Sequence, residues 1–354
     1  MTDRPVDGDK LNAFLGQVVG DAGATTASIM VVLGDRLGLY RGLVSGGPAT
    51  AAELAKRTNL VERYVSEWLN SQAAGGYVRY DSASGKYSME PEQAMALTDD
   101  KSPAFVPGLF QVLQAAWNAM AGIENAFKNG GGIEWGQQHP ALFEGTERFF
   151  RSSYIGNLTS AWLPALDGAV DNLKKGIKVA DVGCGLGAST ILMAQAYPNS
   201  KFVGFDSHPK SIELARTRAR DAGVGDRTEF QVAKSTEFSG KDYGLITFFD
   251  CFHDMEDPAA AARHARAALT PEGHVMLVEP FAHDKPEQNH NPIGRLFYSV
   301  STMICVAHSM ALKGPALGAQ AGEGRLRAIL SEAGFKRVRR ATETPFNLVL
   351  EARP

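Results

Sequence analysis

The sequence predicts an α/β fold, an open and doubly wound sheet that is mainly parallel, following a smaller helical domain at the N-terminus. Short apolar runs alternate with helix-like segments from residue 177 onward, and this order is typical of parallel strands joined by crossover helices. The first of these runs leads into glycines at alternate positions, Gly183, Gly185 and Gly187. Glycines spaced in this way let a backbone turn tightly beside a ligand at the carboxyl edge of such a sheet.

The composition bounds the class of protein. The chain has 354 residues, 44% hydrophobic and 21% charged, which is enough for two domains with a full core. Its net charge of -3 gives no overall attraction to nucleic acid or to an anionic membrane. The three cysteines form no C-x-x-C pair, so neither a zinc site nor a disulfide framework is indicated. No signal peptide and no apolar run near 18 residues is recognised, so we expect a cytoplasmic protein without a membrane span.

Residues 1–98 are predicted to form the N-terminal domain. A capping box at 50–53 opens one helix, and apolar side chains at 61, 65, 68 and 69 lie on one face of the next. Gly75 and Gly76 end that helix, and the segments 77–80 and 86–89 flank a turn. Helix, turn, helix and hairpin together predict a winged helix-turn-helix.

A winged helix can bind DNA or can serve as a dimerisation surface. Residues 1–95 carry nine basic and eleven acidic side chains. The helix that would enter the major groove carries one basic residue, Arg63, and two acidic residues, Glu62 and Glu67. Its net charge is negative, whereas contact with DNA phosphates requires a positive charge. The charge therefore favours dimerisation and closure of a substrate pocket over nucleic-acid binding.

Residues 99–172 are predicted to connect the two domains and to contribute to the site. Apolar spacing predicts helices over 102–128 and 148–172, and glycines at 130–132 separate them. Glycines beside aromatic side chains suit a loop that closes over a ligand. Packing in a core would account equally for the aromatic side chains of this segment.

An acidic residue follows the second predicted strand. Asp206 stands 19 residues after Gly187, where a carboxylate can accept hydrogen bonds from a ribose diol. Gly183, Gly185 and Ala188 also satisfy a dinucleotide pattern, so a nicotinamide dehydrogenase is an alternative. Asp181 argues against it, because a carboxylate two residues before the first glycine can face a cationic ligand and would repel a pyrophosphate.

The pattern D-x-G-x-G-x-G over 181–187 resembles the class I S-adenosylmethionine-dependent methyltransferases. The resemblance covers about 175–354 and implies the seven-stranded, doubly wound sheet of that family, parallel with one antiparallel strand. Its strands are expected near 177–182, 201–205, 227–232, 243–249 and 275–279, with a final hairpin at 336–342 and 346–352. With the winged helix, the layout resembles the small-molecule O-methyltransferases, which implies a homodimer formed through the N-terminal domain.

The resemblance also implies which residues bind S-adenosylmethionine. Trp135 and Tyr154 are expected near its sulfur or carboxylate, and Lys234 and Ser235 near its adenine, although Lys234 could equally be solvated. The full set of expected contacts is Asp181, Gly183, Cys184, Gly185, Asp206, Ser207, Lys234, Ser235, Phe249, Tyr154 and Trp135.

The loop after the fourth predicted strand contains the candidate base. In the resembling O-methyltransferases this loop carries a His-Asp pair and then a tryptophan, and the histidine is the general base. Here the pair is His253-Asp254, with Met255 in place of the tryptophan. A neutral imidazole can remove the proton of a phenol or an alcohol near pH 7, but His253 could instead only bond its own loop.

The acceptor is expected to be a small, aromatic or lipophilic molecule, because a long apolar insertion at about 281–322 follows the fifth strand. Methylation of oxygen is favoured over nitrogen or carbon. A metal-assisted reaction is disfavoured, since no carboxylate–asparagine ligand set follows strand four. The alternative is a regulator that binds S-adenosylmethionine without catalysis and acts through the winged helix.

Overall fold

The computed structural model describes residues 5–354, so part of the N-terminal segment used for the signal-peptide expectation lies outside the described residues. The chain divides into two compact units, residues 1–114 and 115–354. Most of the predicted connector 99–172 belongs to the second unit.

The first unit contains the winged helix-turn-helix. After α1 (Gly8–Arg36) come α2 (Leu39–Gly46), α3 (Ala51–Thr58), α4 (Glu62–Ala74), the hairpin β1 (Arg79–Asp81) and β2 (Lys86–Ser88), and α5 (Pro91–Thr98). The capping box is present, since Thr50 Oγ1 accepts from the N–H of Glu53, whose carboxylate accepts from the N–H of Thr50. Tyr40 and Trp68 meet edge to face in the core of this unit, with ring centroids 4.9 Å apart.

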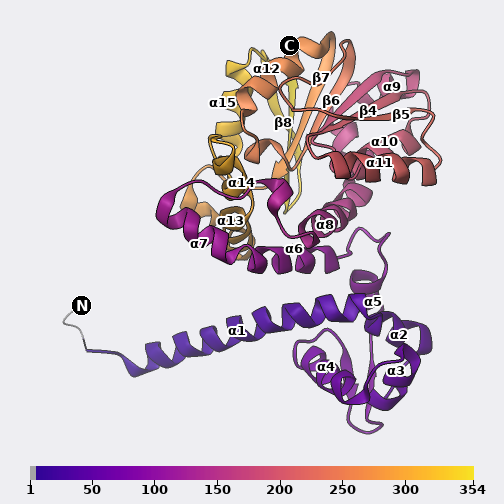
Figure 1. Cartoon of the computed structure of the whole chain (residues 1–354), viewed down its shortest axis with the longest axis vertical. Coiled ribbons are helices and arrows are strands. Elements are labelled where there is room, and N and C mark those ends of the chain that lie inside the picture. Colours follow the sequence, from indigo (N-terminus) through magenta and orange to yellow (C-terminus); the bar gives the residue numbers. More distant parts are fainter. Residues whose placement is uncertain (1–4) are drawn as a thin grey trace. The chain divides into compact units, whose positions relative to one another are not determined.

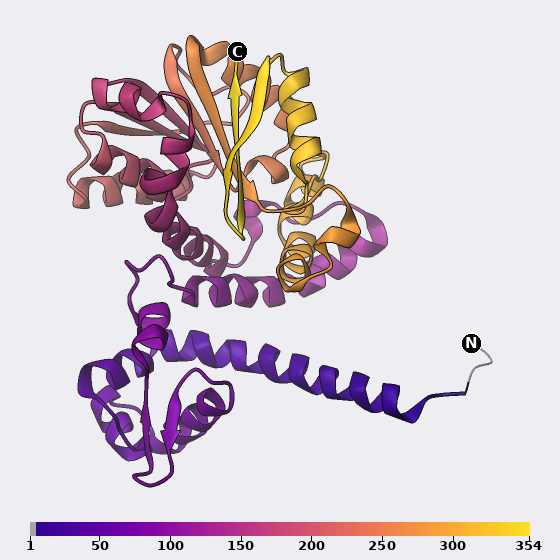
Figure 2. The same ribbon diagram turned by 180° about the vertical axis from the view of Figure 1, so that it is seen from behind.

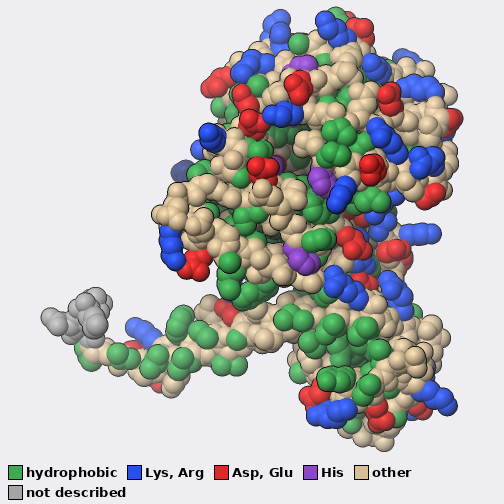
Figure 3. Space-filling view, viewed as in Figure 1, with side chains coloured by type: hydrophobic (Ala, Val, Ile, Leu, Met, Phe, Trp, Pro, Cys, Tyr) green, Lys and Arg blue, Asp and Glu red, His purple; other side chains and the backbone are tan. Residues whose placement is uncertain are grey.

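Helix α1 is an element that the sequence analysis did not anticipate. Most of its length is exposed, including Leu11, Phe14, Leu15, Val18 and Val19, and Figure 3 shows hydrophobic side chains along it. By length and composition alone it is also apolar enough to cross a membrane. The sequence-based expectation rested on uninterrupted apolar runs, and this helix has none near 18 residues because polar side chains and glycines interrupt it.

The connector helices are shorter than predicted. The expected helix 102–128 is two helices, α6 (Pro107–Asn118) and α7 (Met120–Asn129). The expected helix 148–172 begins earlier, as α8 (Ala141–Asn157), and is then interrupted by a π-helical turn and a 3-10 turn before α9 (Ala169–Lys175). Pro164 and Gly168 explain the interruption, since proline lacks an N–H and Gly168 has a φ of 76°.

The second unit is built on a seven-stranded sheet. Its strands are β3 (Lys178–Val182), β4 (Lys201–Asp206), β5 (Thr228–Val232), β6 (Tyr243–Phe249), β7 (Leu269–Pro280), β8 (Arg337–Glu343) and β9 (Asn347–Arg353). The spatial order is β5-β4-β3-β6-β7-β9-β8, and β9 runs antiparallel to both neighbours while the other pairs are parallel. This confirms the predicted fold class.

Helices cover both faces of the sheet, as Figures 1 and 2 show. Val179 packs toward α8, α9, α10 (Ala188–Ala196) and α11 (Pro209–Asp221), whereas its neighbour Ala180 packs toward α12 (Pro258–Ala268) and α15 (Glu323–Glu332). Successive side chains of a strand point to opposite faces. Burial of both faces therefore explains why these strands read as continuous apolar runs.

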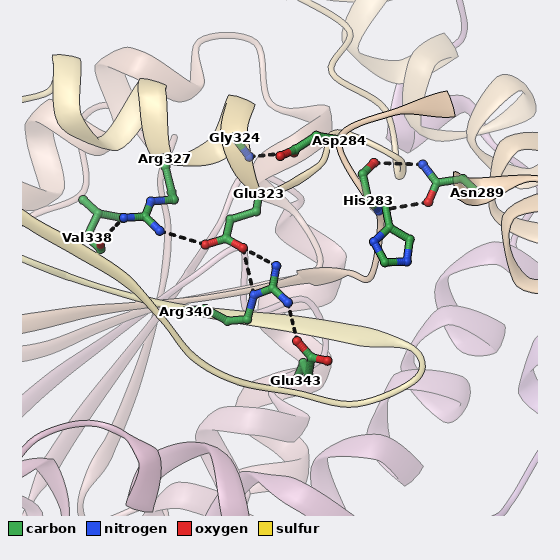
Figure 4. Close-up of polar contacts among 9 residues, drawn as sticks. All are labelled: His283, Asp284, Asn289, Glu323, Gly324, Arg327, Val338, Arg340 and Glu343. Carbon is green, nitrogen blue, oxygen red and sulfur yellow. Dashed lines mark hydrogen bonds and ion pairs between the residues drawn. The ribbon is translucent and has the colours of Figure 1, made fainter. Parts of the chain in front are cut away.

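The insertion after β7 is ordered and anchored at its base. It contains the 3-10 turn Pro286–Asn289, α13 (Pro292–Met303) and α14 (Cys305–Ala311). Asp284 Oδ1 accepts from the N–H of Gly324 at 2.8 Å, and the Asn289 side chain bonds both backbone polar groups of His283. Beside this anchor Glu323 pairs with Arg327 and Arg340 (Figure 4). The first residues of the insertion are therefore held against the first turn of α15.

Candidate functional site

The glycine loop after β3 has a conformation that requires glycine. Gly183 has a φ of 76°, and a Cβ there would lie 2.6 Å from Cys251 Sγ. The N–H groups of Gly183 and Cys184 both donate to the carbonyl of Phe205, at 2.7 and 3.0 Å. These bonds hold the loop against the end of β4, where Asp206 stands.

Asp206 ties this loop to the next one. Its Oδ2 accepts from the N–H of Gly185 at 2.9 Å, and its Oδ1 accepts from the N–H of His208 at 2.8 Å. Burial raises the pKa of this carboxyl, and the two backbone hydrogen bonds oppose that effect. The carboxylate retains acceptor capacity toward the cavity that it lines.

Asp181 does not face the cavity, which corrects the sequence-based expectation. Its side chain is 1% exposed and accepts hydrogen bonds from Ser189 and Thr190 at 2.6 Å and from Thr247 at 3.0 Å. The strand turns this side chain inward, where the hydroxyls of α10 and β6 satisfy it. Asp181 therefore stabilises the glycine loop from the interior of the domain.

The other expected cofactor residues line one cavity of about 500 Å³. The cavity lies at the carboxyl edges of β3, β4 and β6, the functional edge of an open α/β sheet, and its size suits a small-molecule ligand. The predicted residues on its wall are Trp135, Tyr154, Gly183, Cys184, Gly185, Asp206, Ser207, Lys234, Ser235 and Phe249. Lys234 is largely exposed and pairs with Glu256 at 3.3 Å.

One wall of this cavity is aromatic, and only Trp135 was anticipated there. Phe143 lies edge to face with Trp135 and stacks on His208, with ring centroids 5.8 and 4.8 Å apart. The N–H of Trp135 donates to Nδ1 of His308 at 3.0 Å. Segments distant in sequence thus meet over the cavity, which single-sequence spacing cannot reveal.

A buried carboxyl lies at the end of β6. Asp250 has a φ of 51° and accepts from the hydroxyl of Tyr154 and the amide of Asn347, both at 3.3 Å. Burial, reinforced by the nearby charge of Glu279, raises its pKa well above the ordinary value. The β8–β9 hairpin thereby contributes a residue, Asn347, to the edge of the site.

The candidate base lies deeper than expected. His253 occupies the 3-10 turn Phe252–Asp254, is 3% exposed and does not line the cavity, whereas Asp254 does. Its Nδ1 lies 2.5 Å from Oε2 of Glu279, whose Oε1 accepts from the N–H of Phe252 at 2.9 Å. Burial opposes the charged imidazolium, yet the Glu279 carboxylate outweighs it and raises the pKa of His253 well above its usual range.

Glu279 is a site residue that the sequence analysis missed. It lies at the carboxyl end of β7, one residue before the strand ends at Pro280. A carboxylate at a buried strand end beside the ligand edge was the available signal. Its bond to Nδ1 leaves Nε2 as the nitrogen through which His253 can act.

Helix α14 packs directly on the turn that carries His253. Cys305 hydrogen-bonds His253, and Ser309 Oγ donates to the carbonyl of Met255 at 3.2 Å. The N–H of Gly318 donates to the carbonyl of His253 at 3.3 Å. The insertion therefore encloses the candidate base.

Comparisons with known proteins agree with this geometry. Residues 173–334 match the model of a family described as methyltransferase domain, and residues 25–99 match the Rv2258c-like winged HTH domain. Residues 173–334 are a methyltransferase domain. This confirms the resemblance that Asp181, Gly183, Gly185 and Gly187 indicated.

Related proteins match shorter stretches of the chain. The ubiquinone biosynthesis O-methyltransferase of Bordetella avium is 30% identical over 127 residues, which is 35% of this chain and 49% of that protein. The 27-O-demethylrifamycin SV methyltransferase of Amycolatopsis mediterranei is 33% identical over 108 residues, 30% of this chain and 39% of that protein. The chain thus spans about half or less of the length of these relatives.

Solved structures match the whole fold. Human N-acetylserotonin methyltransferase in complex with S-adenosylmethionine has a TM-score of 0.72 at 16% identity, covering 100% of this chain and 99% of that one. The mitomycin 7-O-methyltransferase MmcR has a TM-score of 0.71 at 20% identity, covering 98% and 100%. The chain therefore has the fold of the S-adenosylmethionine-dependent methyltransferases.

Proposed function

We propose that this protein transfers the methyl group of S-adenosylmethionine to an oxygen of a small aromatic or lipophilic acceptor. The observation that carries the proposal is the meeting of three features at one sheet edge: the glycine loop at Gly183, the acid Asp206 and the His253–Glu279 pair. A methyltransferase domain in residues 173–334 supports the cofactor assignment. The residues present fit this cofactor. The glycines place no side chain between the loop backbone and a ligand, and the Asp206 carboxylate can still accept hydrogen bonds from a ribose diol.

The bound cofactor supplies an electrophilic methyl group, and the chain supplies position, exclusion of water and a proton acceptor. Asp206 and the loop at 183–185 hold the nucleoside, while Trp135 and Tyr154 close the cavity around it. His253 is proposed to take the acceptor's hydroxyl proton at Nε2 in its neutral form, with Glu279 holding Nδ1. Because Glu279 also raises the pKa of His253, the fraction of protein with a neutral imidazole, and with it turnover, is expected to increase as pH rises. Since His253 is 3% exposed, the acceptor must approach it past Asp254, the neighbouring residue that lines the cavity.

The acceptor class is inferred from the walls around the base. The insertion supplies Leu312 to the cavity, and Phe143 and Met255 add further apolar surface. An aromatic or lipophilic molecule with one ionisable hydroxyl suits this surface.

The alternative is a regulator that binds S-adenosylmethionine and acts on DNA through the winged helix. The charge of α4 argues against it, because its Arg63 is paired with Glu67 on the same helix. Binding of random duplex DNA at physiological salt, together with no turnover on any acceptor, would favour this alternative.

We further propose a cytoplasmic homodimer that assembles through the first unit. Leu11, Phe14, Leu15, Val18 and Val19 of α1 recur at a spacing of three and four residues and are 43% to 71% exposed. Such a stripe is typical of a helix that packs on a partner.

The proposal is tested by calorimetry and by turnover. S-Adenosylhomocysteine is expected to bind with one site per chain, and a nicotinamide dinucleotide is expected to give no heat. A panel of phenols and alcohols is then assayed with methyl-labelled cofactor. Replacing His253 by alanine is expected to lower turnover by about 10²-fold or more while cofactor affinity stays unchanged. Unchanged turnover in that variant would remove His253 from the mechanism.

A further inference from the structure

Three metal-binding side chains converge beside the cavity. His253, Asp254 and Cys305 each offer one donor atom, and these nitrogen, oxygen and sulfur atoms all lie within 4.8 Å of one another. His253 and Asp254 are adjacent in the turn after β6, whereas Cys305 comes from α14, 51 residues further along the chain. The cluster exists only because the insertion folds back over the turn.

The donor set is of the kind that thiophilic divalent cations prefer. Zinc binds thiolate, imidazole and carboxylate at about 2.0–2.3 Å, usually with four ligands in a tetrahedron. Neighbouring donors around such an ion are roughly 3.3–3.8 Å apart. The three donor atoms here lie at most 4.8 Å apart, so side-chain rotation needs to bring them closer by only about 1 Å. Magnesium and calcium prefer oxygen ligands alone and are disfavoured here.

The surroundings of His253 match those of a metal-bound imidazole. Its Nδ1 lies 2.5 Å from Glu279, and a carboxylate on the far nitrogen is the usual partner of a ligating histidine because it fixes the ring and raises its basicity. Nε2 is the nitrogen left for an ion. Cys305 is a free thiol, 9% exposed, that already contacts this imidazole.

The cluster is reached through the cavity, since Asp254 lines it. We propose that His253, Asp254 and Cys305 bind a zinc-like divalent cation, and that this cation inhibits methyl transfer by occupying the nitrogen that would accept the proton. Binding forms bonds from sulfur, nitrogen and oxygen to the ion, and it releases to water the thiol proton of Cys305 and the Nε2 proton of the charged His253 imidazole. Only the inhibitory consequence rests on the proposed function.

Cobalt(II) tests the binding directly, because a thiolate ligand gives it a charge-transfer band in the near ultraviolet. One equivalent of Co²⁺ is expected to produce this band in the full-length protein kept with a non-chelating reductant. The band should disappear in Cys305→Ser and persist in the matched variants Cys184→Ser and Cys251→Ser. In Asp254→Asn the band should persist while Co²⁺ affinity falls by about tenfold or more.

Enzyme assays test the consequence. Zn²⁺ at equimolar concentration is expected to stop methyl transfer, a chelator to restore it, and Cys305→Ser to weaken the inhibition at least about tenfold. Absence of the band, or an equal band in Cys305→Ser, overturns the metal site. A band that depends on Cys305, with methyl transfer insensitive to Zn²⁺, overturns the inhibitory role. Failure of the proposed function itself would be seen as no turnover on any acceptor, and the cobalt readout is independent of that result.

Discussion

Glu279 binds the turn after β6 at two points: its Oε2 lies 2.5 Å from Nδ1 of His253 and its Oε1 accepts the N–H of Phe252. One side chain therefore sets both the orientation of the imidazole and the path of the backbone that carries it. In the proposed mechanism the charge of Glu279 also stabilises the imidazolium that forms when His253 accepts a proton. Glu279 is therefore proposed as a positioning residue.

Replacing Glu279 by glutamine is expected to lower kcat by roughly ten- to a hundredfold, because the amide can still bond Phe252 but no longer carries the charge that faces His253. The dissociation constant of S-adenosylhomocysteine should stay unchanged. Glu272→Gln, on the exposed part of the same strand, is the matched control for kcat. Equal kcat in both variants would contradict the positioning role.

Replacing Gly183 by alanine is expected to weaken binding of S-adenosylhomocysteine, measured by calorimetry. The new Cβ would lie 2.6 Å from Cys251 Sγ and would also sit at a φ of 76°. Gly85→Ala separates the two effects, since Gly85 has a similar φ of 66° in the wing and nothing within 4 Å. Both variants should lose about 1–2 kcal/mol of unfolding free energy from the left-handed backbone, but only the first should lose affinity. Restored affinity on adding Cys251→Ala would identify the clash as the cause.

Replacing Glu351 by glutamine is expected to reduce stability at neutral pH by about 1–3 kcal/mol, because the buried His274 and the partly exposed Arg339 lose their anionic partner. Glu351 is 1% exposed, lies 2.6 Å from Nδ1 of His274 and pairs with Arg339. Burial would raise its pKa, but the bond from His274 and the charge of Arg339 lower it below the ordinary value. The stabilisation is therefore complete above the ordinary pKa and is lost as pH falls through the lowered one.

Urea unfolding at several pH values measures whether the stability changes with pH in this direction. The stability difference between the wild type and Glu351→Gln should shrink as the solution is acidified below about pH 4.3, the ordinary value for glutamate. Glu332→Gln, an exposed acid at the end of α15, should show no such difference. A difference that grows in acid would contradict the assignment.

Replacing both Phe14 and Val18 by glutamate is expected to convert the proposed homodimer into a monomer, because two charges would have to be buried in an apolar contact. Light scattering after gel filtration should give twice the chain mass for the wild type and the chain mass for the variant. Ala13→Glu, an exposed position on the opposite side of α1 from this apolar stripe, is the control. A wild-type protein that elutes at the chain mass would refute assembly through this helix.

The sheet and most of the cavity could be predicted because local signals encode them. Strands buried on both faces read as apolar runs, and Gly183 and Asp206 mark the turns that follow two of them. The depth of His253 and the inward turn of Asp181 could not be predicted, since both depend on partners far along the chain, Glu279 and Thr247.

Two helical features escaped prediction for a different reason. Helix α1 contains Gly16, Gly20 and Gly23, which lower its helix propensity, and the apolar spacing from Leu11 to Val19 was the available signal. The division between α6 and α7 at Ala119 carries no proline or glycine, and no local signal announces it.

The position of β9 between β7 and β8 also determines when the protein can complete its fold. Asn347, at the start of β9, supplies an amide to Asp250 across the sheet. A nascent chain can pair β3 to β7 while synthesis continues, but this buried acid lacks that partner until residues 347–353 have left the ribosome. The rim of the cavity beside Asp250 is therefore complete only once β9 has paired with β7.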